Sequence, residues 1–76
     1  MEAKDIEKLN ILLSHWIEHN ESHIKSYADW AVKLEGTGLQ DVGRLIGEAA
    51  DTIARANEKF KQARETFDSL DKSEND

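Results

Sequence analysis

Apolar residues recur at alternating spacings of three and four along nearly the whole chain, in two stretches separated by a short glycine-containing segment. This heptad spacing keeps an apolar stripe on one side of an α-helix, where it can pack against neighbouring helices. The chain contains no proline, the residue that breaks or kinks a helix when it lies in the interior. The first stretch comprises Ile6, Leu9, Leu13, Trp16, Asn20, His23, Tyr27, Trp30 and Leu34. The second comprises Leu39, Val42, Ile46, Ala49, Ile53, Ala56, Phe60, Ala63, Phe67 and Leu70. The pattern predicts an all-α protein of two long helices.

Between the two stretches, the signals for ending one helix and starting the next lie close together. Gly36 suits the left-handed conformation that commonly follows a helix end. Thr37 suits the N-cap of the next helix, and Gln40 three residues later would complete a capping box. We therefore expect one antiparallel two-helix hairpin domain over residues 1–76. Its predicted parts are a first helix at about 3–35, a loop at 36–38, a second helix at about 38–71 and a frayed tail at 72–76.

The apolar stripe of the first helix is too broad for one neighbouring helix to cover. Four further apolar residues widen it, namely Leu12, Ile17, Ile24 and Ala31. A row of mostly small residues in the second helix is expected to face the aromatic residues of the first helix. This row consists of Val42, Ala49, Ala56 and Ala63. In this arrangement Trp30 would lie opposite Gly43 and Tyr27 opposite Ile46, so that Gly43 and Gly47 would make room for aromatic rings. We expect a homodimer that completes a four-helix bundle, or alternatively a hairpin that docks on another protein.

All three histidines of the chain, His15, His19 and His23, lie four residues apart, which places them on successive turns of one helix side. Imidazoles at this spacing can chelate a divalent transition metal such as Zn, Ni, Co or Cu. In the alternative interpretation, polar seam residues such as Asn20 and His23 fix the alignment of the helices through buried hydrogen bonds. The second helix offers mainly alanine and isoleucine at the same level, which favours the structural interpretation.

A sharper motif overlaps the first two histidines. His15, Glu18 and His19 match H-x-x-E-H, in which two histidines bind zinc and the glutamate activates water. Such a metallohydrolase needs a further carboxylate ligand, and the available Glu58 and Glu65 are both predicted to point outward. We therefore expect a protein without a reaction of its own, with the hydrolase as a remote alternative and no catalytic residue assigned.

Composition restricts the partners and the compartment. Sixteen acidic and ten basic residues give a net charge of −6, which disfavours binding to nucleic acid or to an anionic membrane surface. The sequence shows no signal segment and no apolar run of membrane-spanning length. The absence of cysteine excludes disulfides and thiolate metal sites. We expect a soluble, acidic, cytoplasmic protein that binds neither nucleic acid nor membranes.

One block of the sequence carries a resemblance. The segment from His15 to Asn20 together with His23, followed by Tyr-x-x-Trp-Ala at residues 27–31, resembles small uncharacterised prokaryotic helical-hairpin proteins with an HWxEHNxxH block. The glycine loop and the alanine-rich second helix also look similar, so the resemblance covers most of the chain. It implies a helical hairpin in which the block acts as a unit, and it brings no catalytic role.

Overall fold

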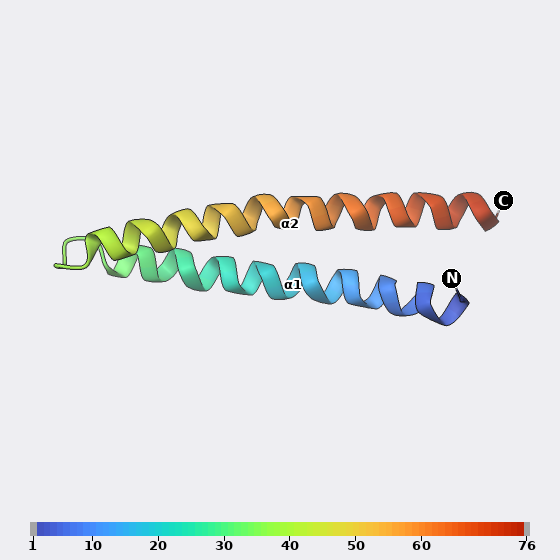
Figure 1. Ribbon diagram of the computed structural model, residues 1–76, viewed down its shortest axis with the longest axis horizontal. Helices are drawn as coiled ribbons and strands as arrows, with labels where there is room; N and C mark the ends of the chain where they lie inside the picture. Colours follow the sequence, from blue (N-terminus) through green and yellow to red (C-terminus); the bar gives the residue numbers. More distant parts are fainter. Residues whose placement is uncertain (1, 76) are drawn as a thin grey trace.

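The protein is an antiparallel hairpin of two long helices in the computed structural model, which describes the backbone of residues 2–75 and the side chains of residues 2–70. Helix α1 (Ala3–Lys33) and helix α2 (Gln40–Asn75) run side by side, with the loop at one end and both termini at the other (Figure 1). The molecule measures 58 × 17 × 15 Å. No strand occurs between residues 2 and 75, so the prediction of an all-α hairpin is confirmed. Neither helix, over its described residues, is long and apolar enough to cross a membrane.

The loop is shaped by one glycine and one hydroxyl group. Gly36 has a φ of 71°, which confirms the predicted left-handed glycine. The Thr37 hydroxyl donates to the carbonyl of Leu34 at 2.7 Å and accepts from the backbone N–H of Leu39 at 3.1 Å. Helix α2 begins at Gln40, so its N-cap position is taken by Leu39 and not by Thr37. Thr37 therefore closes the loop instead of capping α2 in the predicted capping box.

The C-terminal ends of both helices differ from the boundaries predicted from the sequence. The chain tightens at the end of α1, where the N–H of Glu35 donates to the carbonyl of Val32 three residues back, so the regular helix ends at Lys33. Helix α2 continues to Asn75, and no glycine or proline interrupts its last residues. The predicted frayed tail at 72–76 involves residues whose side chains lie outside the described part of the chain.

The row of α2 that faces α1 is one residue away from the predicted row. Gly43, Ala50 and Asn57 are buried, whereas Val42 is 47% exposed and the alanines of its predicted row, Ala49, Ala56 and Ala63, are also exposed. Helix α1 contributes two deeply buried side chains, Leu13 and Ile17, to the same interface. The prediction that the row of Val42 faces α1 is therefore wrong.

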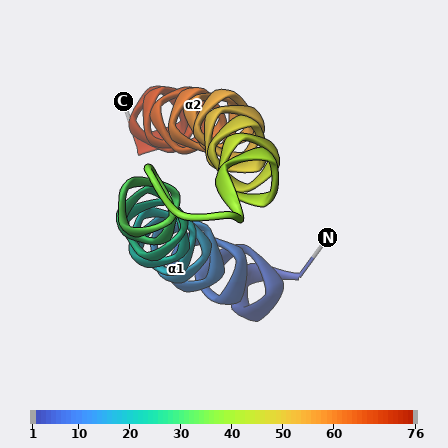
Figure 2. The same cartoon turned by 90° about the vertical axis from the view of Figure 1, so that its left-hand side faces the viewer.

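A close approach of the two helices near the loop explains the difference. A Cβ atom at Gly43 would lie 3.0 Å from the Cβ of Leu34 and 3.3 Å from the carbonyl oxygen of Ala31. Gly43 thus makes room for the helix α1 itself and not for an aromatic ring, and Trp30 remains 52% exposed. Viewed from the loop end, the two helices tilt in opposite directions, as in a supercoiled pair (Figure 2).

Candidate functional site

A buried pair of asparagines fixes how the two helices align. Asn57 is 2% exposed, and its Oδ1 accepts a hydrogen bond of 3.0 Å from the Nδ2 of Asn20. Its own Nδ2 donates to the backbone carbonyl of Ile17 at 3.3 Å. Sliding one helix by a turn would leave the amide of Asn57 buried without these partners, so the pair favours a single register. Sequence reasoning proposed Asn20 for this role but missed Asn57, whose place in an alanine-rich stretch was the available signal.

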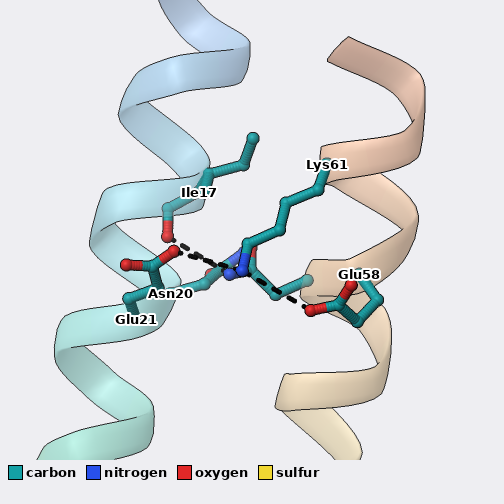
Figure 3. A network of polar contacts seen from close by, with 6 residues as sticks. Ile17, Asn20, Glu21, Glu58 and Lys61 are labelled. Carbon is teal, nitrogen blue, oxygen red and sulfur yellow. Dashed lines mark hydrogen bonds and ion pairs between the residues drawn. The ribbon is translucent and has the colours of Figure 1, made fainter. Parts of the chain in front are cut away.

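One edge of the hairpin beside this pair is charged. The Nζ of Lys61 lies 3.5 Å from a carboxylate oxygen of Glu21 on α1 and 3.5 Å from one of Glu58 on α2 (Figure 3). The Lys61 side chain is 36% exposed and both carboxylates are more exposed, so the ion pairs add little stability. They do place charge along this edge, and the pair of Lys61 with Glu21 joins the two helices there.

On the side of the hairpin away from this charged edge, one face carries aromatic rings from both helices. The ring of Trp16 lies 6.1 Å from the ring of Phe60, so these side chains of α1 and α2 share one face of the hairpin. At about 100° per residue, His23 and Trp30 project from the same side of α1 as Trp16. We call this surface the aromatic face. It comprises Leu12, Trp16, His19, His23 and Trp30 of α1, with Val42, Ala49, Ala56, Phe60 and Ala63 of α2.

A shallow hollow lies within the aromatic face. Its volume is about 340 Å³, and it is lined by Trp16, His19, Asn20 and Phe60. Three of these four side chains are rings, and all four come from the centre of the hairpin. The hollow is therefore suited to an apolar side chain placed against this face from outside.

The three histidines form a stack of exposed rings along α1. The rings of His15 and His19 lie 5.9 Å apart and nearly parallel, at 25°. The rings of His19 and His23 lie 4.4 Å apart, edge to face, and their Nε2 atoms are 2.9 Å from each other. The ring of Tyr27 continues the stack, 5.7 Å from that of His23. Of the predicted ligands, only His19 and His23 bring nitrogen atoms together, and His23 is exposed instead of lying in the seam between the helices.

The described residues of one chain do not assemble a complete metal centre. Among them, no group of three or more His, Cys, Asp or Glu side chains is placed to hold an ion. His15 stacks on His19, and Glu58 is directed to Lys61. The ligand set that the H-x-x-E-H hypothesis requires is therefore not brought together within the described part of the chain.

The chain matches a family model described as "Domain of unknown function (DUF8180)" over residues 9–67. It belongs to the DUF8180 family. The part of this DUF8180 member that matches contains the loop, the asparagine pair and the three histidines. The chain is also 34% identical over 58 residues to an "Uncharacterized protein" of Archaeoglobus fulgidus, an alignment that spans 76% of this chain and 92% of that relative. No solved structure matches this DUF8180 member. These findings confirm the predicted membership of a small uncharacterised family.

Proposed function

We propose that this protein is a small, non-enzymatic self-association module that forms a homodimer through the aromatic face and so completes a four-helix bundle. The observation that carries the proposal is the apolar surface that one hairpin leaves uncovered. Trp16, Trp30, Val42 and Phe60 are 38%, 52%, 47% and 36% exposed. Exposed apolar side chains also occur elsewhere on the hairpin, as at Ile11 and Val32, but on the aromatic face the rings of Trp16 and Phe60 adjoin across the two helices. Apolar surface that is continuous in this way marks interaction sites.

The small core of one hairpin supports the same proposal. Among the side chains that the structure describes, the buried apolar ones are Leu13, Ile17 and Ala50. A chain of this length with so little buried apolar surface gains limited stability from its own folding, and association with a partner is a common remedy. Covering the aromatic face would extend the core across the full width of both helices.

The aromatic face carries both halves of a self-complementary contact. Its α1 side presents the bulky rings of Trp16 and Trp30, and its α2 side presents the small side chains of Ala49 and Ala56. A two-fold axis that lies in the interface and runs across both helices would set α1 against α1 and α2 against α2 of the second copy. Trp16 of one copy would then meet the level of Trp30 of the other and the alanine rows would pack together, as an isologous interface requires. A second copy of this chain is therefore the partner that fits the face.

One side of the hairpin is large enough for a dimer interface. The molecule is 58 Å long and 17 Å wide, which gives one whole side a projected area on the order of 1,000 Å². Specific protein interfaces take about 800 Å² from each partner. A dimer interface of standard size would thus use most of the side that carries the aromatic face.

The experiment compares two lysine substitutions by sedimentation equilibrium over a range of concentrations. Trp30 and Val32 are both exposed, but they project about 200° apart around α1, so only Trp30 belongs to the aromatic face. We expect Trp30→Lys to raise the dimer dissociation constant by about 30-fold or more, since burying a lysine in place of a tryptophan costs at least about 2 kcal/mol. Val32→Lys should leave the constant unchanged.

Net charge cannot explain this difference, because both variants change the net charge of −6 to −5. Circular dichroism should confirm that both remain helical. A wild-type chain that stays monomeric at all concentrations would contradict the proposal, and so would equal effects of the two lysines. Binding of the monomer to a different protein would then be the alternative to pursue.

A further inference from the structure

We infer that His19 and His23 form half of a divalent transition-metal site, which the same two residues of a second copy complete. This inference goes beyond self-association and rests on it, because the second half of the site comes from the partner in the proposed dimer. The juxtaposition that carries it is the pair of Nε2 atoms 2.9 Å apart on one exposed side of α1.

The geometry of this pair is close to that of two cis ligands. With metal–nitrogen bonds of about 2.05 Å, two ligand nitrogens are roughly 2.9 Å apart at a 90° ligand angle and roughly 3.3 Å apart at the tetrahedral angle. The observed separation of 2.9 Å fits the first case, and a small rotation of one exposed ring reaches the second. Without a metal, the Nε2–H of one ring donates to the Nε2 of the other. For both Nε2 atoms to bind an ion, the donor ring would carry its hydrogen on Nδ1 instead, so both rings stay neutral.

The remaining histidine does not belong to the pair. His15 stacks on His19 with ring centres 5.9 Å apart at 25°, whereas the nitrogen contact of 2.9 Å joins His19 to His23. Two imidazoles occupy only half of a tetrahedral coordination shell. The described residues of the same chain supply no third ligand of the His, Cys, Asp or Glu type to this group.

The place of the pair on the aromatic face indicates where the other ligands come from. Trp16 lies seven residues before His23 and Trp30 seven residues after it, so His23 is at the midpoint between the two large rings on α1. The two-fold axis of the proposed dimer, which lies in the interface and crosses α1 at this midpoint, would therefore pass near the histidines. This operation brings four imidazoles, two from each copy, to one point.

Neutral imidazoles are ligands for Zn, Ni, Cu and Co, and the site contains no carboxylate that would favour Mg or Ca. A metal held between two copies would also tighten their association, because binding of the ion and of the partner are thermodynamically linked. The site would thus make the dimer responsive to a transition metal.

The experiment is calorimetric titration of the untagged protein with Zn(II) and with Ni(II), combined with sedimentation in the presence of the metal or of a chelator. We expect one ion for every two chains and a dimer that is weakened by the chelator. His19→Gln and His23→Gln should each weaken metal binding by about 100-fold, since even the loss of an outer partner of a ligand costs 10- to 100-fold. His15→Gln is the matched control and should bind metal like the wild type.

The two proposals fail in different ways in this experiment. A dimer that binds no ion, or that binds it equally well after His19→Gln, would overturn the metal site and leave self-association intact. One ion per chain, with the same affinity in Trp30→Lys as in the wild type, would overturn the shared site. A monomer without metal affinity would overturn both proposals.

Discussion

Replacing Asn57 with alanine should destabilise the hairpin by about 2–3 kcal/mol, because two buried hydrogen bonds are lost at about 1 kcal/mol each and a small void remains. The side chain is 2% exposed, so water cannot reach it to compensate. A chain of 76 residues has a stability of roughly 4–11 kcal/mol at typical values per residue. The substitution would therefore remove a large share of the total.

The partner of Asn57 allows a double-mutant cycle. Asn20→Ala removes one hydrogen bond and leaves the Oδ1 of Asn57 buried without a donor, at a cost of about 1–3 kcal/mol. In the double variant this oxygen no longer exists. The double variant should therefore cost about 1 kcal/mol less than the sum of the single variants.

Urea unfolding followed by far-ultraviolet circular dichroism measures these differences. With a slope of about 1 kcal/mol per molar urea, Asn57→Ala should lower the midpoint by roughly 2 M. All variants must be compared at one chain concentration, because association adds to apparent stability. Asn10→Ala, at an exposed position of α1, is the control and should change stability by less than about 0.5 kcal/mol. A loss below about 0.5 kcal/mol for Asn57→Ala, or strictly additive costs for the pair, would refute the reasoning.

Two further predictions concern the interface between the helices and can be measured in the same unfolding assay. Gly43→Ala should destabilise the hairpin by about 1–3 kcal/mol, because the new Cβ would lie 3.0 Å from the Cβ of Leu34. Gly47→Ala should instead stabilise it by about 0.5–1 kcal/mol, because the new Cβ would lie 3.6 Å from the Cβ of Ala31, which is an ordinary contact. Effects of the same sign would show that the helices do not approach as described. Lys61→Met should cost no more than about 1 kcal/mol, and the difference from wild type should shrink as salt is added, because its ion pairs are largely exposed. A larger cost that is insensitive to salt would contradict this.

The sequence predicted which side of α1 carries the three histidines but not how their rings are arranged. The helical spacing of His15, His19 and His23 gave their common side of α1, because that depends only on the rise and rotation of a helix. The spacing did not reveal that His15 would stack on its neighbour while His19 and His23 converge. Side-chain rotation decides between stacking and convergence, and residue order does not encode it.

The sequence by itself determined the two helices and the turn at Gly36. Heptad spacing and a left-handed glycine depend on residues that are close in the sequence, so they can be predicted without knowing the tertiary contacts. Only the tertiary structure decided which side of each helix packs inside the hairpin and which side forms the aromatic face. When an apolar stripe is broad enough for two interfaces, the sequence does not say which of its residues pack inside the hairpin and which remain on the aromatic face. Here the division follows from the two positions where packing is least tolerant, the close approach at Gly43 and the buried amide of Asn57, which must meet its partners on α1.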